Sequence, residues 1–332
     1  MPPLQSPGRR LASLGLSLVL APSLASLSLP ARAAPTYHLV DLGPSTQADH
    51  IDNRGDISGR TANDVGYLRH GTWHSTADVG TIAAADDRGD LLEASWGGQV
   101  VYAPRGGSAI TLPPVPGVDW SVGTGIAPGR VIVQAAVGPY YIAACYLWTP
   151  DAGYQAFGAP GAPCVANAVN ESGQVTGWHV DDIGATVAYV WTDGVFQDIP
   201  VLPGAVRGAM EIEEGTGINR HGHVVLFARM KDGSYHAGLF RGRHVVDIGA
   251  CAAGAPLAIS DSDQVIGSTD AGDGWLWSAG VSTPLSQLVD AGPEWTSLQG
   301  SSINADGVIV GNGLLSGEPH AFVLRPVGAQ GR

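Results

Sequence analysis

Apolar and polar residues follow one pattern that returns seven times along this chain. It is clearest at 169–175, where Val169 is followed by Asn170, two polar residues, Gly173, one further residue and Val175. An Asn or Asp side chain can bond the backbone two residues on and so begin a turn. The Gly can adopt a positive φ without a Cβ clash. Each copy of this first phrase therefore predicts a turn between two short strands of a hairpin.

The seven copies are spaced 34 to 49 residues apart. The third is one residue short in its turn, and the sixth has Asp263 in place of the turn Gly. Internal repetition at such a spacing is typical of repeat architectures. The copies begin at Ile51, Ala85, Ile126, Val169, Ile218, Ile259 and Ile303.

A second phrase, rich in aromatic and β-branched residues, follows each first phrase. Examples are 189–191 (Tyr-Val-Trp) and 275–277 (Trp-Leu-Trp), and a Gly turn and a short strand usually come next. That last strand ends in a sequence such as Asp247-Ile248-Gly249. Such residues between Gly turns favour strands, so each repeat predicts about four of them. A four-stranded unit of about 40–45 residues has the size of a propeller blade. The fixed place of the Trp residues predicts that they pack between blades.

The two ends of the repeat region complement each other. The seventh repeat stops after 322–326 and lacks its last strand, whereas 37–43 resembles a last strand without a repeat before it. We therefore predict an all-β fold, a β-propeller of seven four-stranded blades closed by pairing the N- and C-terminal strands, which protects the sheet edge. Six or eight blades and a β-solenoid are the alternatives.

The two phrases together resemble a bacterial extracellular repeat family named for its His-Ala-Phe motif. His320-Ala321-Phe322 matches that triplet outright, and 236–238 and 187–189 match it in part. The first phrase is clearest at 303–307 (Ile-Asn-Ala-Asp-Gly). The resemblance covers 34–332 with uneven strength. It implies export and tandem β-repeats, and it implies no agreed activity and no catalytic residues.

Residues 1–33 have the pattern of a secretory signal peptide. Arg9 and Arg10 precede a Leu-, Ala- and Ser-rich run, and Ala31-Arg32-Ala33 fits a cleavage site. A retained N-terminal membrane anchor is the alternative. We expect a single domain at 34–332, secreted or periplasmic, monomeric, and without a membrane span after cleavage.

The chain is acidic, with a formal net charge of −13 and Lys231 as its only lysine. Such a surface repels phosphate backbones, which disfavours nucleic-acid binding. Three cysteines lie beyond the signal segment. Cys145 and Cys164 are close in sequence and could form a disulfide in an oxidising compartment. Three small buried thiols are the alternative.

Two clusters carry potential chemistry. His221, His223 and His236 fall in the fifth repeat and are weak candidates for a metal site. The better interpretation is that the first two flank a turn, and no cofactor is predicted. Glu211 and Glu213 are weak candidates for a catalytic pair, since alternate residues of an extended segment share a face. Acidic residues in a solvated loop are far commoner.

Turns and packing account for nearly every repeated residue. The leading hypothesis is therefore a non-catalytic binding or interaction propeller whose partner is an envelope or extracellular protein or a glycan. Because a fold does not determine a function, the ligand stays unidentified. The alternative is an enzyme, a glycosidase or lyase acting on an extracellular polysaccharide. A structural protein of the surface or matrix is a third alternative.

Overall fold

The computed structural model describes residues 37–76, 81–94, 99–118, 120–137, 142–158, 163–206, 213–252, 258–269, 271–289 and 294–328. By its internal contacts the chain divides into two units, Met1–Ala33 and Ala34–Arg332, and every described residue belongs to the second. No helix among these residues has the length and apolar character needed to cross a membrane. The predicted signal segment lies outside the described residues.

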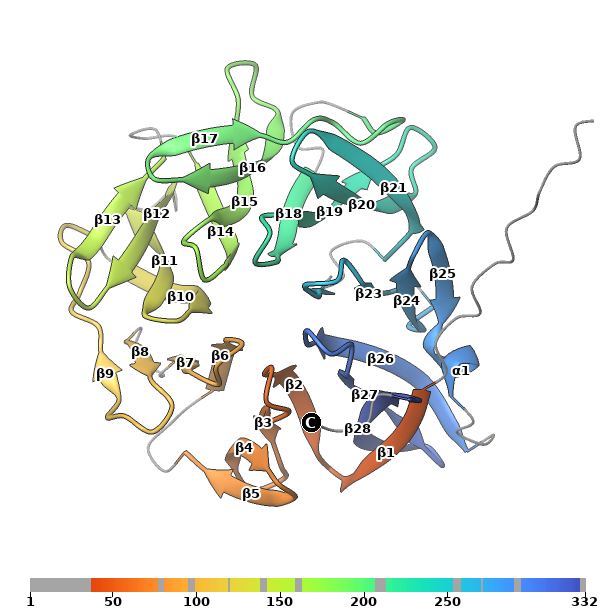
Figure 1. Cartoon of the computed structure of the whole chain (residues 1–332). Helices are drawn as coiled ribbons and strands as arrows, with labels where there is room; N and C mark the ends of the chain where they lie inside the picture. The colour runs from red at the N-terminus through yellow and green to blue at the C-terminus, as the bar shows by residue number, and fades with distance from the viewer. Residues whose placement is uncertain are drawn as a thin grey trace, which may run out of the picture. The chain divides into compact units, whose positions relative to one another are not determined.

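Seven four-stranded antiparallel sheets form a ring in the second unit (Figure 1). The chain is a seven-bladed β-propeller, as the repeats predict. Blade 1 is β2 (Gln47–Ile51), β3 (Ile57–Arg60), β4 (Val65–Arg69) and β5 (Thr72–Ser75); blade 2 is β6 (Thr81–Ala85), β7 (Leu91–Ala94), β8 (Val100–Ala103) and β9 (Ile110–Thr111); blade 3 is β10 (Trp120–Ala127), β11 (Arg130–Val137), β12 (Ile142–Thr149) and β13 (Gly153–Phe157).

Blades 4 to 7 repeat this order from the innermost strand outward. Blade 4 is β14 (Cys164–Val169), β15 (Val175–Val180), β16 (Thr186–Thr192) and β17 (Val195–Asp198); blade 5 is β18 (Glu213–Ile218), β19 (Val224–Arg229), β20 (Tyr235–Arg241) and β21 (His244–Ala250); blade 6 is β22 (Ala258–Ile259), β23 (Val265–Ser268), β24 (Gly274–Ser278) and β25 (Val281–Pro284); blade 7 is β26 (Trp295–Ile303), β27 (Ile309–Leu315), β28 (Glu318–Pro326) and β1 (Tyr37–Pro44).

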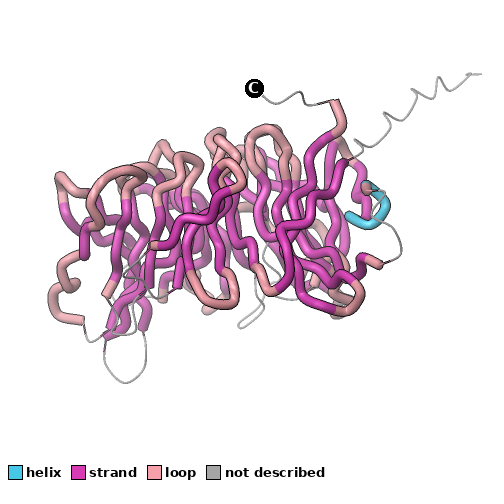
Figure 2. Tube along the Cα trace, turned by 90° about the horizontal axis from the view of Figure 1, so that it is seen from below, coloured by secondary structure: helices cyan, strands magenta, loops and turns pink. Residues whose placement is uncertain are grey.

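The ring is closed by strands from the two ends of the repeat region. β1 pairs antiparallel with β28, with Tyr37 opposite Pro326 and Val40 opposite Val323. This confirms the predicted closure. The sequence did not predict the short helix α1 (Leu285–Leu288) after blade 6, whose Leu285 and Leu288 are buried on one face. Seen edge-on, the strands run across the thickness of the ring and the turns lie at its two faces (Figure 2).

The Asn of the first phrase has two functions. Oδ1 of Asn170 accepts hydrogen bonds from the backbone N–H of Ser172 (3.1 Å) and Gln174 (3.0 Å), which fixes the turn. Its Nδ2 donates to the carbonyl of Asn219, the same position in the next blade, at 2.9 Å. Asn219 donates in turn to Ser260, and Asn304 to Asp52. One side chain therefore stabilises a turn and joins neighbouring blades.

Apolar cores lie between blades rather than within one. The buried Trp148 packs with Leu92 and Tyr102 of the preceding blade, and Trp191 packs with Ile132. Trp275 and Trp277 are also buried, as predicted, whereas Trp73 is half-buried. Among the described residues, apolar clusters fill six of the seven junctions, and none is found between blades 1 and 2.

Ion pairs join blades 1 and 2 instead. Arg105, between β8 and β9, places Nη1 2.7 Å from Asp52 and Nη2 2.6 Å from Asp56, both in the first turn of blade 1. Nε of Arg69 lies 2.7 Å from the same Asp56 carboxylate. The side chains of Asp52 and Asp56 are at most 9% exposed, so these ion pairs are weakly screened. We call these four residues the ionic seam.

Candidate functional site

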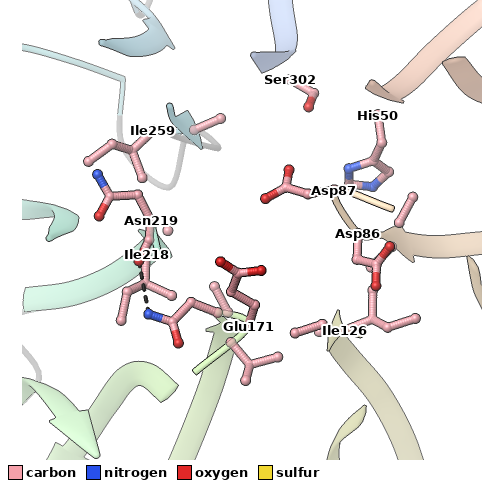
Figure 3. A pocket seen from close by; sticks show the side chains of 18 of the residues that line it. His50, Asp86, Asp87, Ile126, Glu171, Ile218, Asn219, Ile259 and Ser302 are labelled. Carbon is pink, nitrogen blue, oxygen red and sulfur yellow. Dashed lines mark hydrogen bonds between the residues drawn. The ribbon is translucent and has the colours of Figure 1, made fainter. Parts of the chain in front are cut away.

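The seven innermost strands surround a cavity of about 330 Å³ in the centre of the ring (Figure 3). Most of these strands carry a β-bulge just before the first phrase, as between Ala48 and His50 and between Ala166 and Ala168. A bulge re-aims the residues beside it. In every blade the residue before the apolar start of the phrase lines the cavity; these are His50, Ala84, Gly125, Ala168, Gly217, Ala258 and Ser302.

His50 is the one large side chain at these seven positions. The others are Gly, Ala or Ser, so the cavity wall is made largely of backbone and methyl groups. Burial lowers the pKa of His50. The nearby charge of Asp49 and a hydrogen bond to the backbone of Ala83 act in the opposite direction and offset only part of this decrease. The imidazole is therefore neutral at pH 7, and the bond to Ala83 leaves one ring nitrogen able to accept a proton.

Carboxylates gather at the end of the cavity where the first-phrase turns lie. Asp87, Glu171 and Asp261 line it there, together with Arg220. In Figure 3 the side chains of Asp87 and Glu171 point into the cavity from different blades. Desolvation by the surrounding protein, together with the charges of Asp261 and Glu171, raises the pKa of Asp87 to about 6. Nε of Arg220 lies 3.5 Å from Asp261 and compensates this charge only in part. We call this end the acidic mouth.

Asp86 occupies the Asn position of the second repeat. Its Oδ1 accepts hydrogen bonds from the N–H groups of Arg88 and Asp90, both at 2.9 Å, as the Asn residues do. Its Oδ2 takes the place of the Asn Nδ2, and it is buried without a hydrogen-bond partner among the described residues. Burial raises the pKa of Asp86 to about 6. Protonated, Oδ2 would regain the donor that Asn supplies in blades 4, 5 and 7.

The structure does not bring the predicted histidine candidates together. His221 and His223 flank Gly222 in the first turn of blade 5 with ring centroids 5.9 Å apart, and Nδ1 of His223 lies 2.8 Å from Asp263. His236 pairs in register with Ala228, at the other end of β19, and its Nδ1 lies 2.9 Å from Asp247. Within the described part of the chain, no group of three or more His, Cys, Asp or Glu could hold a metal ion.

The two acidic candidates carry no catalytic assignment. Glu211 lies outside the described residues. Glu213 begins β18, where its backbone pairs with Ala228, and its side chain is not among those described. The acidic groups that do line the cavity are Asp86, Asp87, Glu171 and Asp261.

A disulfide joins Cys145 of β12 to Cys164 of β14, with the two Cα atoms 5.9 Å apart. Both residues are buried, so the bond ties blade 3 to blade 4 inside the core that they share. Cys251 is a buried thiol in the core between blades 5 and 6.

Sequence reasoning missed His50 and Asp87. Both lie within two residues of a phrase start, at positions whose residue type varies from copy to copy, whereas the predictions depend on residues that recur. Aligning the seven copies and comparing the residue just before each phrase would have found His50, because the other six are Gly, Ala or Ser. Variation at a fixed position of a repeat is the signal that was available.

No protein-family model matches this chain, and no curated protein does. Solved structures do match. Virginiamycin B lyase from Staphylococcus aureus, a catalytically inactive variant with quinupristin, is 10% identical with a TM-score of 0.56, covering 88% of this chain and 100% of the other. The β-propeller domain of the Trilobed protease from Pyrococcus furiosus, which has an open velcro topology, is 11% identical with a TM-score of 0.50, covering 88% and 96%. These similarities support the propeller fold.

Proposed function

We propose that this chain is an exported binding propeller that takes a slender part of its ligand into the central cavity through the acidic mouth. The observation that carries the proposal is the wall of the cavity, where six of the seven positions before the phrase are Gly, Ala or Ser. Small side chains leave room along the axis and present backbone groups, which suits a concave site with few polar anchors.

The charge of the mouth favours a ligand group that is positively charged or rich in hydrogen-bond donors. Asp87 and Glu171 point inward, and among the described residues that line the cavity Arg220 is the one arginine or lysine. A primary amine on an extracellular peptide or on an amino sugar has this chemistry. Carboxylates that the protein fixes at the edge of a cavity attract an ammonium group more strongly than carboxylates in bulk water do.

Ligand binding can be tested by blocking the cavity. Ala168 lines it, whereas Ala156 is exposed on the outer strand β13. We expect lysine methyl ester and glucosamine to bind the purified domain in calorimetric titrations, and Ala168→Leu to abolish this binding while Ala156→Leu leaves it unchanged. Equal affinity in both variants would place the ligand elsewhere. Asp87→Asn combined with Glu171→Gln tests the charge, with an expected loss of at least tenfold in affinity.

A lyase or hydrolase is the second candidate. His50, with a lowered pKa, and Asp87, with a raised pKa, line the same cavity. Perturbed pKa values gather at functional sites, and a neutral imidazole in a cavity can act as a general base. The similar virginiamycin B lyase was crystallised as an inactive histidine-to-alanine variant. Breakdown of an extracellular polysaccharide by the wild type, lost in His50→Ala with binding retained, would favour this candidate.

Export is part of the proposal, and the pattern of 1–33 and the Cys145–Cys164 disulfide support it, because disulfides persist in oxidising compartments. Expression of the full chain in a bacterial host, followed by N-terminal sequencing of the periplasmic and secreted fractions, tests it. We expect a mature start at Ala34. An uncleaved cytoplasmic product would contradict export. Membership of the His-Ala-Phe repeat family is proposed on the same motifs.

A further inference from the structure

A second cavity lies beside the shortened turn of the third repeat, on the face of the ring that carries the acidic mouth. Ile126 pairs directly with Val131 across a four-residue turn, whereas Val169 pairs with Val175 across five. Beside Pro128 and Gly129 of this turn lies a cavity of about 440 Å³. The other residues that line it are Arg54, Arg88, Asp90, Tyr102 and Arg105.

Three guanidinium groups at one cavity are unusual in a chain with a net charge of −13. Arg105 is held by Asp52 and Asp56 in the ionic seam. The Asp90 carboxylate is also occupied, because it accepts hydrogen bonds from the Tyr102 hydroxyl at 2.7 Å and from the N–H of Arg105 at 2.8 Å. These contacts fix the floor of the cavity. The other two arginines that line it are Arg54 and Arg88.

Arg54 and Arg88 retain most of their hydrogen-bonding capacity. Nη1 of Arg54 reaches the carbonyl of Arg88 at 3.4 Å, and no carboxylate among the described residues lies within 4.0 Å of its guanidinium. Nη2 of Arg88 lies 3.8 Å from Glu171, with the two side chains 63% and 50% exposed. An exposed ion pair at this distance contributes little. Both guanidinium groups can therefore bind a ligand.

We propose that this cavity binds an oxyanion, a carboxylate, sulfate or phosphate group of a polar ligand, through Arg54 and Arg88, with Arg105 as a fixed positive charge behind them. A guanidinium offers paired N–H donors whose spacing matches two oxygens of such a group. The cavity shares only Pro128 with the central one, so the inference does not depend on the function proposed above. An acidic saccharide of the cell envelope has the required chemistry.

Inorganic sulfate, inorganic phosphate and glucuronate serve as probes, titrated into the purified domain while the arginine Nε–H signals are followed by NMR. We expect saturable binding of at least one probe, weakened at least tenfold by Arg54→Gln and by Arg88→Gln. The control Arg243→Gln removes the same charge from the turn between β20 and β21 and should change the affinity less than twofold. The tightest probe identifies the oxyanion class. Absence of saturable binding, or equal losses in the control, overturns the proposal.

A second pair of variants acts on the cavity without removing an arginine. Gly129 has a φ of 68°, which Asn and Asp tolerate better than other side chains, and a Cβ there would meet nothing within 4 Å. Gly129→Asp places a carboxylate beside the arginines, whereas Gly129→Asn has the same shape without charge. We expect the Asp variant to lose probe binding and the Asn variant to retain it within about threefold. Equal behaviour of the two variants contradicts an oxyanion site.

Discussion

Nδ1 of His320 lies 2.8 Å from Oδ1 of Asp41, across the strand pair that joins the two ends of the repeat region. The same carboxylate oxygen accepts a hydrogen bond from the N–H of Gly43 at 2.9 Å. His236 and Asp247 form the matching pair within blade 5, where Gly249 donates to Asp247. In these two blades, the His of the His-Ala motif thus contacts the Asp of the last strand.

Substitution of His320 should weaken the closure of the ring. His320→Ala removes the bond to Asp41 and the edge-to-face contact with Trp295, whose ring centroid is 5.9 Å away. We expect a loss of about 1–2 kcal/mol in the free energy of unfolding and faster amide exchange in β1. His236→Ala, whose strands are joined by a turn, is the control and should leave exchange in β1 unchanged. Unaltered β1 exchange in His320→Ala would show that backbone pairing alone holds the closure.

Asp86→Asn should stabilise the protein at neutral pH. A carboxyl group whose pKa is raised to about 6 on folding favours the folded state below its unfolded pKa, and this contribution is lost as the pH rises through 6. Asp86 is only 7% exposed, and a shift of about two units corresponds to about 3 kcal/mol. Urea unfolding at pH 4 and pH 7.5 should therefore give a larger gain for Asp86→Asn at pH 7.5.

The reverse substitution is the matched control for Asp86. Asn170→Asp in blade 4 replaces the Nδ2 donor to Asn219 by an oxygen, so it should destabilise the protein more at pH 7.5 than at pH 4. If both variants gave the same change at the two pH values, the carboxyl at this position would not be coupled to folding.

Arg105→Met should destabilise the ionic seam. It leaves Asp52 buried without its ion pair, while Asp56 keeps Arg69. Breaking a buried pair in this way costs about 3 kcal/mol or more, measured as the free energy of unfolding. Arg88→Met, at an exposed pair, should change it by less than about 1 kcal/mol. Adding Asp52→Asn to Arg105→Met should recover part of the loss, and failure to recover would contradict an electrostatic origin.

Removing the disulfide should lower stability without changing the fold. Cys145 and Cys164 are 19 residues apart in sequence, and a bond closing a loop of that size contributes about 2–4 kcal/mol. We expect the double variant to Ala to unfold at lower urea concentration by this amount. Cys251→Ala, which removes a buried thiol and no disulfide, should have a smaller effect. Similar urea midpoints for the double variant and the wild type would show that packing outweighs the covalent link.

The first phrase allowed the turns to be predicted because an Asn and a Gly act on backbone only a few residues away. The donation from Asn170 to Asn219 was not predictable, because its acceptor is a backbone carbonyl 49 residues on and leaves no mark in sequence. Arg105 reaches Asp52 over 53 residues for the same reason. Closure was predictable because the seventh repeat, which stops after 322–326, lacks a last strand. Residues 37–43 have the pattern of a last strand without a repeat before it.

The chemistry of the cavities was harder to predict because it depends on positions where copies of the repeat differ. His50 stands where the other blades have Gly, Ala or Ser, and the arginine cavity lies beside a turn that lost one residue. Their chemistry depends on residues from three or more blades, which only the closed ring brings together. The repeats predict the ring well, whereas these sites depend on the exceptions.

The pairing of β1 with β28 also constrains the order of events during synthesis. Among the described strands, Tyr37–Pro44 is made first, and its partner Glu318–Pro326 is made after all the others. A growing chain therefore carries this strand without its native partner until Glu318–Pro326 has been made. Any product truncated before residue 318 would expose that strand to whatever protein it meets.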